Sequence, residues 1–129
     1  MITASLQNYR ISPRKVRIVA DMIRGKKVSV AKTILEMGTK KARHPIAALI
    51  DSAVANAKHN HQIEGELIVK EIRVDQGYVL KRSIPMSRGS AFPIKKKTSH
   101  VSIVLAPAPV KTAKKTPVKA AAKAPAAKK

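Results

Sequence analysis

Residues 75–97 read DQGYVLKRSIPMSRGSAFPIKKK, and this stretch decides the fold of the 129-residue chain. Its centre is filled with turn-forming residues: Pro85, Ser87, Gly89, Ser90 and Pro93. Segments with alternating apolar residues flank it at 66–74 and 98–105. If these segments pair as antiparallel strands, the residues between them continue the pairing as a two-stranded arm. We therefore predict a long β-hairpin that protrudes from the body over about residues 76–97.

This arm needs support from outside the chain. It carries six cations and no acid: Lys81, Arg82, Arg88, Lys95, Lys96 and Lys97. An isolated hairpin is marginally stable in water, and this one lacks a well-filled apolar face beyond Leu80. The alternative is an unstructured basic loop, but long loops of that kind are uncommon in compact domains. Because the arm is positively charged, we expect the support to be nucleic acid.

Two short helical patterns come before residue 40. Ser12-Pro13 has the residue types of a helix cap and a first helical position, and Gly25 is a typical helix end. Between them, apolar residues recur at helical spacing: Val16, Val19, Ala20 and Ile23. A second short helix is expected from a Ser29 cap to a stop at Gly38.

The third helical pattern is the longest. Its apolar stripe consists of Ile46, Leu49, Ile50, Ala53, Val54 and Ala57. Pro45 is tolerable in the first turn of such a helix, and the polar cluster 58–62 marks its end.

Three segments have the alternation of strands, namely 2–7, 66–74 and 98–105. In the second segment, simple alternation places Ile68, Lys70, Ile72 and Val74 on one face, opposite Leu67, Val69, Glu71 and Arg73. The predicted fold class is therefore α+β, with three helices packed on a small antiparallel sheet that carries the long hairpin.

The last 24 residues, 106–129, differ in composition from the rest of the chain. They contain 7 Lys and 4 Pro among mostly Ala, with Val as the one larger aliphatic type. Such a segment buries too little apolar surface to offset its ordering entropy, so we predict disorder. It serves either as a solubilising tail or as a polycation that gathers phosphate. Residues 1–105 then form one globular domain that includes the arm.

The net charge identifies the kind of partner. It is +20, from 27 Lys and Arg against 7 Asp and Glu, and residues 76–129 contain no acid. A chain this positive repels itself unless a polyanion neutralises it, so nucleic acid is the leading partner. Tyr9, Tyr78 and Phe92 are the only aromatic residues, too few for single-strand binding by base stacking. Recognition through phosphates and shape fits this composition better.

Several classes of protein and site are disfavoured by residues that the sequence lacks. The chain has no cysteine, which excludes disulfides, thiol nucleophiles and cysteine-ligated zinc. It has no apolar run of 18 residues and no signal-peptide pattern after Met1, so we expect a cytoplasm-like setting and no membrane contact. His59-x-His61 lacks the further ligands that a metal needs, so we expect no metal or other cofactor.

The acidic residues give no sign of catalysis. Glu64, Glu66, Glu71 and Asp75 are spaced as ion-pair partners for nearby Lys and Arg rather than as a paired acid and base. We therefore do not expect an enzyme.

Two other classes of binding protein remain as alternatives. The arm could wedge Pro85, Met86 and Phe92 into DNA and bend it, as architectural proteins do. The small residues between them instead suit close passage beside folded RNA. A polycationic protein of the membrane surface is the weaker alternative, because no helix combines a basic face with a bulky apolar one.

Five segments in the same order resemble one family, the large-subunit ribosomal proteins conventionally numbered twenty-two, in the bacterial form. They are RISPRKVRIVADMIRGKKV at 10–28, ILEMGTKKA at 34–42, SAVANAKHNH at 52–61, KEIRVDQGYVLKR at 70–82 and RGSAFPIKKKTSHVSIVL at 88–105. The resemblance covers about residues 2–105, and the ordered series is more specific than any single segment.

The resemblance implies a function in the cytoplasmic ribosome. Family members have an α+β body near the exit of the nascent-peptide tunnel and a hairpin that runs inward between rRNA segments. The hairpin tip lines the tunnel, and changes at the tip are associated with an altered macrolide response. The implied partners are large-subunit rRNA, neighbouring large-subunit proteins and the nascent peptide. The implied role is structural and supports subunit assembly, without enzymatic activity.

The family's contact positions can be carried onto this chain. In the body, the implied rRNA contacts are Arg10, Ser12, Arg14, Lys15, Arg17, Arg24, Lys26 and Lys27. On the arm they are Lys81, Arg82, Arg88, Lys95, Lys96, Lys97, Thr98 and His100. The implied tunnel tip is Pro85, Met86, Ser87, Arg88, Gly89, Ser90 and Ala91, within a turn that ends at Pro93. Two arginines that are usual in family tips are replaced here by Met86 and Ser90.

Overall fold

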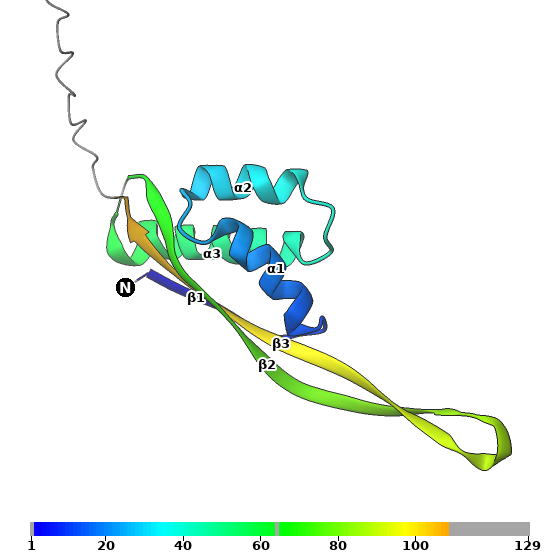
Figure 1. Cartoon of the computed structure of the whole chain (residues 1–129). Helices are drawn as coiled ribbons and strands as arrows, with labels where there is room; N and C mark the ends of the chain where they lie inside the picture. The colour runs from blue at the N-terminus through cyan, green and yellow to red at the C-terminus, as the bar shows by residue number, and fades with distance from the viewer. Residues whose placement is uncertain (1, 64, 109–129) are drawn as a thin grey trace, which may run out of the picture.

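The structure, a computed structural model, describes residues 2–63 and 65–108 (Figure 1). Its elements in chain order are β1 (Ile2–Tyr9), α1 (Pro13–Ile23), α2 (Val28–Met37), α3 (Arg43–His61), β2 (Leu67–Pro85), the 3₁₀ turn η1 (Ser87–Gly89) and β3 (Ala91–Pro107). The α+β prediction, with three helices and an antiparallel sheet, is confirmed. Most of the expected disordered tail, residues 109–129, lies outside the described residues.

The three strands form one antiparallel sheet in the order β1-β3-β2. The two long strands pair along their whole length, from Leu67 opposite Pro107 to Pro85 opposite Ala91. Figure 1 shows the helices gathered against one end of these strands, while the other end continues beyond them as a twisted two-stranded ribbon. The predicted protruding hairpin is therefore present.

The first helix follows its sequence signals closely. Pro13 is its first residue, where the missing N–H has no helical partner to lose. Ser12 occupies the cap position in an extended conformation, but its side chain makes no capping hydrogen bond. The helix ends at Ile23, and Gly25 follows with a φ of 73°, a conformation that favours glycine. Val16, Ala20 and Ile23 are fully buried, as their spacing predicts.

The expected cap of the second helix is wrong. Helix α2 begins at Val28 with Lys27 as its cap, so Ser29 lies inside the first turn. The reason lies in β2, because the segment before the helix pairs with that strand through a bridge between Lys27 and Ile68. This bridge keeps Lys27 extended until the helical hydrogen bonds begin, the first of them from Ala31 N to Lys27 O at 2.8 Å. The expected stop at Gly38 is confirmed.

The third helix extends slightly beyond its predicted stripe at both ends. Pro45 lies in its first turn, and the helix stops before Gln62, whose φ of 50° is left-handed. Its apolar stripe packs against the sheet and the other helices as one core. The largest fully buried aliphatic side chains of that core come from α1, α3, β2 and β3: Val16, Ile23, Ile46, Ile50, Val69, Ile72, Val101 and Ile103.

Simple alternation along β2 is wrong because the strand contains a β-bulge. Val69 lies opposite Leu105 and Glu71 opposite Val104, so Lys70 is an extra residue in the ladder. One inserted residue moves every later side chain to the other face. Leu67 and Val69 are therefore buried before the bulge, and Ile72 and Val74 after it. Within residues 67–74, all the large aliphatic residues except Ile68 thus reach the core, whereas strict alternation would divide them between the two faces.

The C-terminal strand is longer than expected. Ala106 and Pro107, predicted as the start of the tail, still pair with Ile68 and Leu67. Ala108 N then donates to Glu66 O at 2.8 Å. The backbone before β2 supplies hydrogen-bonding partners that the composition of residues 106–108 does not reveal. Pro107 is tolerated because it lies at the end of the strand.

Candidate nucleic-acid interface

The arm presents its cations to the outside along two paired strands. Lys81, Arg82, Lys95, Lys96 and Lys97 are all exposed. Lys81 and Lys95 lie directly opposite each other in the ladder. Like charges at directly opposite positions destabilise a pair of strands. The arm therefore gains stability from any polyanion that lies against it, in agreement with the argument from composition.

The base of the arm is marked by a second irregularity. Gln76 lies opposite Ser99 and Val79 opposite Lys97, so two residues of β2, Gly77 and Tyr78, face the single residue Thr98. The Thr98 hydroxyl donates to the Tyr78 carbonyl at 2.8 Å, and Thr98 is 1% exposed. Its hydroxyl is therefore bonded inside the protein, so the expected rRNA contact at Thr98 is wrong.

The neighbouring His100 also takes part in the base of the arm. Asn8 N donates to His100 Nδ1 at 3.1 Å, which ties β1 to β3 where the sheet gives way to the ribbon. The His100 ring is half-buried. A Cβ added to Gly77 would lie 2.9 Å from His100 Nε2 and even closer to Thr98 Oγ1. Glycine is thus required here by a close approach of two side chains.

Replacing Gly77 by alanine is expected to destabilise the protein by about 1–3 kcal/mol, because the added methyl group overpacks a site whose neighbours are hydrogen-bonded. Urea unfolding followed by circular dichroism measures this change. Gly65→Ala is the matched control, since a Cβ at Gly65 meets nothing within 4 Å. Equal stability of the two variants would show that the base of the arm adapts freely.

The tip of the arm is closed by polar bonds rather than by apolar packing. Met86 N donates to Ser90 O at 2.8 Å, and the Ser90 hydroxyl donates to Ser87 O at 2.9 Å. Arg88 and Gly89 both have positive φ, at 58° and 73°. All residues from 85 to 93 are exposed, including Met86 at 52% and Phe92 at 62%. The expected tip residues therefore lie together at the far end of the arm.

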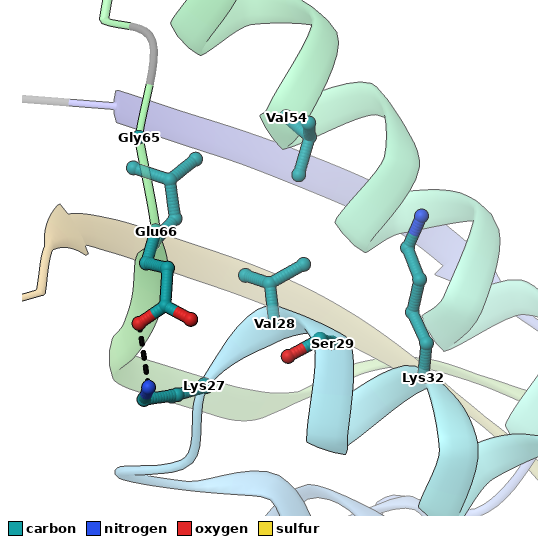
Figure 2. Close-up of a pocket in the computed structure, with 8 residues that line it drawn as sticks. Lys27, Val28, Ser29, Lys32, Val54, Gly65 and Glu66 are labelled. Atoms are coloured by element: carbon teal, nitrogen blue, oxygen red, sulfur yellow. Dashed lines mark hydrogen bonds and ion pairs between the residues drawn. The ribbon is translucent and has the colours of Figure 1, made fainter.

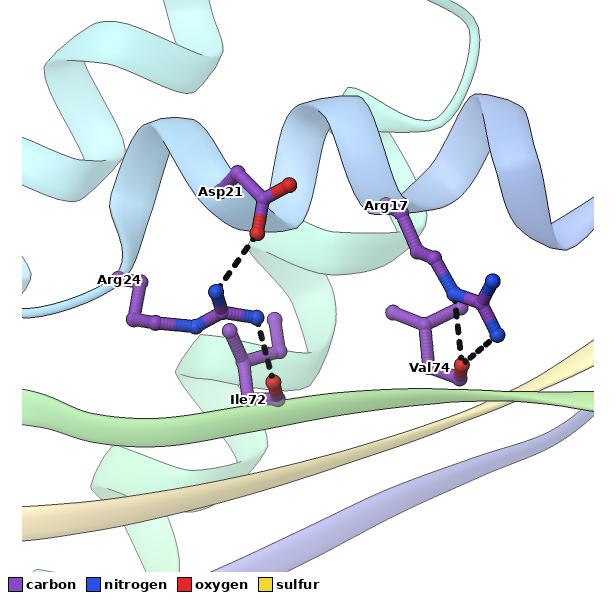
Figure 3. Close-up of polar contacts among 5 residues, drawn as sticks. All are labelled: Arg17, Asp21, Arg24, Ile72 and Val74. Carbon is purple, nitrogen blue, oxygen red and sulfur yellow. Dashed lines mark hydrogen bonds and ion pairs between the residues drawn. The ribbon is translucent and has the colours of Figure 1, made fainter.

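Two arginines of the body have a role that sequence reasoning missed (Figure 3). Arg17 donates from Nε and Nη2 to the Val74 carbonyl, at 3.1 and 2.9 Å. Arg24 donates to the Ile72 carbonyl at 3.2 Å and pairs with Asp21 at 2.8 Å. Both hold α1 against β2, which is an edge strand of the sheet. The available signal was their spacing, because positions 17, 21 and 24 share one face of a helix.

Lys27 is also engaged within the body (Figure 2). Its Nζ lies 2.5 Å from Glu66 Oε2, at the rim of a hollow of about 340 Å³ between the start of α2, α3 and the start of β2. Val28, Val54 and Leu67 line that hollow. Among the residues that the structure describes, Glu66 is the only acid in the lining of this hollow.

The remaining expected contacts fall on the two sides of α1. Arg14 and Arg17 line a cleft together with Lys95 and Lys97 of the arm. Arg10 and Lys15 line another cleft, of about 770 Å³, with Lys40 and Lys41. The sequence-based set lacked Lys40 and Lys41, although two adjacent lysines just after Gly38 were a visible signal. Lys26 is exposed beside the engaged Lys27.

Comparison with known proteins identifies the family. A family model described as Ribosomal protein L22p/L17e matches residues 4–106. The chain belongs to this family. Three relatives carry the name large ribosomal subunit protein uL22. That of Desulfitobacterium hafniense (strain Y51) is 53% identical over 97 residues, or 74% of this chain and 85% of the relative. Those of Deinococcus radiodurans and Thermus thermophilus are 52% and 48% identical, over 75% and 74% of this chain and 73% and 86% of the relatives.

The L22p/L17e match covers the body and the whole arm, tip included, and the chain is accordingly a ribosomal protein. Of the acids expected as ion-pair partners, Glu66 and Glu71 form ion pairs among the described residues, whereas Asp75 forms none there. Glu66 pairs with Lys27, and Glu71 pairs with Arg73 at 2.5 Å. The Arg73 guanidinium lowers the pKa of the Glu71 carboxyl below its ordinary value, while burial raises the pKa of the Tyr9 hydroxyl. The expectation for Glu64 lies outside the described residues.

Two further features were sought among the described residues, a metal site and a membrane-spanning helix. Within residues 2–63 and 65–108, no three His, Asp or Glu residues gather closely enough to hold a metal ion. No helix in these ranges is long and apolar enough to cross a membrane.

Proposed function

We propose that the chain is a structural constituent of the large ribosomal subunit in the cytoplasmic ribosome. It binds large-subunit rRNA, supports subunit assembly and lines the nascent-peptide exit tunnel with the tip of its arm. The observation that carries this proposal is the arm itself, a paired ribbon without an acid beyond Asp75, with Lys81 opposite Lys95. The relatives named large ribosomal subunit protein uL22 support it.

The exposed apolar residues of the arm support burial in an assembly. Ile84, Met86 and Phe92 are 46%, 52% and 62% exposed in the isolated chain. Ile84 and Phe92 face each other in the ladder and still remain largely exposed, whereas close RNA and protein surfaces would cover them. The arm's partners are therefore rRNA along its stem and, at its tip, the tunnel wall and the nascent peptide.

The proposed rRNA contacts divide by how free each side chain is. Those of the body are Arg10, Ser12, Arg14, Lys15, Arg17, Arg24, Lys26 and Lys27, of which Arg17, Arg24 and Lys27 also hold the body together. Those of the arm are Lys81, Arg82, Arg88, Lys95, Lys96, Lys97 and His100. The proposed tunnel tip is residues 85–91. Neighbouring large-subunit proteins complete the set of partners.

The proposal assigns no catalytic role to the chain. Body and arm together, residues 1–105, act as one rRNA-binding unit, and the lysines of 106–129 add affinity for phosphate without choosing the site. A free DNA-bending protein is the alternative that uses the same exposed Phe92 as a wedge.

Sedimentation tests the proposed function. The tagged full chain should travel with large subunits at physiological salt, and its absence there would contradict the proposal.

The tip is tested by replacing residues 84–92 with Asn-Gly, a pair that closes a two-residue hairpin between the facing Ser83 and Pro93. This variant should keep its thermal unfolding midpoint and still enter large subunits, because the core lies elsewhere. A crosslinker at residue 86, in the tip of the full chain, should react with the nascent peptide. A crosslinker at residue 83, which ends the shortened arm of the variant, should not. Loss of the folded body would instead show that the arm is part of the core.

A further inference from the structure

A basic cleft lies where the arm leaves the body. Its walls come from the start of α1 and from the base of the arm, and its volume is about 530 Å³. Arg14 and Arg17 contribute from α1, Lys95 and Lys97 from β3, and Ser12 and Gln76 complete the polar lining. Figure 1 shows the beginning of α1 close to the point where the two strands continue without helices.

The charge of this cleft is unbalanced. Four of its lining residues are cations and none is an acid. Gathering four like charges around one concave site is unfavourable unless an anion occupies it. Guanidinium and ammonium groups form short, charge-assisted hydrogen bonds with phosphate oxygens, and an arginine can bind two of them at once. The occupant with the right chemistry is therefore a phosphate group.

One wall of the cleft is already fixed in place. Two N–H groups of Arg17, on Nε and Nη2, are held by the Val74 carbonyl. Among the described residues its Nη1 makes no hydrogen bond, so this nitrogen is available to a ligand. The Ser12 hydroxyl also makes no capping bond. Groups that are held in position before binding lose less entropy when a ligand arrives.

One wall of the cleft belongs to the body and the other to the arm, and a bulge in the sheet lies between these two parts. Figure 1 shows helices beside β2 and β3 at the end toward the body, whereas toward the tip the two strands form a bare ribbon. The change occurs at the bulge in which Gly77 and Tyr78 face Thr98. A ligand that bridges Arg14 or Arg17 to Lys95 or Lys97 therefore spans this bulge.

We propose that the cleft binds one backbone phosphate of rRNA and that this phosphate fixes the direction of the arm relative to the body. The inference rests on the proposed function, because it takes rRNA as the source of the phosphate. The inference adds that the cations of the interface have two different roles. Most cations contribute affinity, whereas these four couple RNA binding to the geometry of the arm.

Inorganic phosphate tests the site without RNA. In the ¹⁵N-labelled full chain, phosphate should shift the backbone amides of Arg14, Gln76 and Lys97, and chloride at equal ionic strength should not. The double variant Arg14→Gln, Lys97→Gln should weaken phosphate binding by about tenfold or more, since it removes two charged donors. The matched control is Lys58→Gln, Lys70→Gln. It removes the same charge from two exposed positions of the body that lie outside the cleft and outside the proposed rRNA contacts. Equal weakening in both variants, or no shift at all, would overturn the site.

Pulsed electron paramagnetic resonance tests the effect on the arm. The chain has no cysteine, so Ser52→Cys on α3 and Ser83→Cys on the arm give two unique, exposed spin-label sites. A large-subunit rRNA transcript should narrow the distance distribution in the otherwise unchanged chain and in the control variant. The cleft variant, at saturating RNA, should keep a broad distribution. If it narrows like the others, the proposed coupling is wrong while rRNA binding stands. If the unchanged chain fails to bind the transcript, the proposed function fails as well.

Discussion

Replacing Ile103 by alanine is expected to lower the free energy of unfolding by about 2–5 kcal/mol, because it removes buried carbon atoms and leaves a cavity. Ile103 is fully buried on the central strand β3. It pairs with Ala4 of β1 on one side and with Ile72 of β2 on the other. Paired strands therefore hold this position on both sides, so the cavity is difficult to relieve by local collapse.

Urea unfolding at 25 °C, followed by far-ultraviolet circular dichroism, measures this loss. The matched control is Val104→Ala, which removes carbon from the next residue of the same strand. Val104 points to the other face and is half-exposed, so its loss should stay within about 1 kcal/mol. Similar losses at the two positions would contradict a sheet with helices on one face only. Since domains of this size are commonly stable by 5–15 kcal/mol, the Ile103 variant should remain measurably folded.

The helices and the arm could be predicted because their signals are local. Apolar residues at helical spacing and a proline at the first position place α1 correctly. The cluster of turn-forming residues places the tip of the arm, and the flanking alternation places the start of its strands. Each of these signals acts over a few neighbouring residues and needs no knowledge of distant partners.

The bulges could not be predicted because they depend on what the partner strand does. Lys70 and one residue of the pair Gly77-Tyr78 are extra relative to β3, and nothing in the local alternation shows an insertion. The prediction of a Ser29 cap failed for the same reason, since a bridge between Lys27 and Ile68 extends the backbone before α2. In each case a contact between segments far apart in the sequence overrides a local preference.

The candidate site was predictable in its residue types but not in the use of each side chain. Arg14 and Arg17 are three positions apart and chemically identical, yet only Arg17 reaches a carbonyl, that of Val74, 57 residues later. Thr98 likewise donates to Tyr78, 20 residues earlier. A basic sequence therefore predicts a polyanion partner, whereas the structure decides which cations first serve the protein itself.

Neutralising three cations of the arm is expected to have the largest effect on binding. The triple variant Lys81→Gln, Arg82→Gln, Lys96→Gln should bind large-subunit rRNA roughly a hundredfold more weakly at 0.1 M salt. It should also lower the slope of log affinity against log salt concentration by about two to three. All three side chains are exposed on the arm, and none lines the cleft at its base. Filter binding across a salt series measures both quantities.

The salt dependence of the affinity distinguishes direct contacts between the arm and rRNA phosphates from a general attraction by net charge. The control triple Lys32→Gln, Lys58→Gln, Lys70→Gln removes the same charge from positions of the body that are outside the proposed contacts; Lys58 and Lys70 are exposed and Lys32 is half-buried. Lys32 loses an exposed ion pair with Asp51, which changes stability little. If a net charge of +20 attracted RNA without regard to position, both triples would lower the slope equally. If the slope falls only in the arm triple, rRNA phosphates lie along the two-stranded arm, because counterions are released only where cations and phosphates meet. Equal falls would reduce the arm to one positive surface among several.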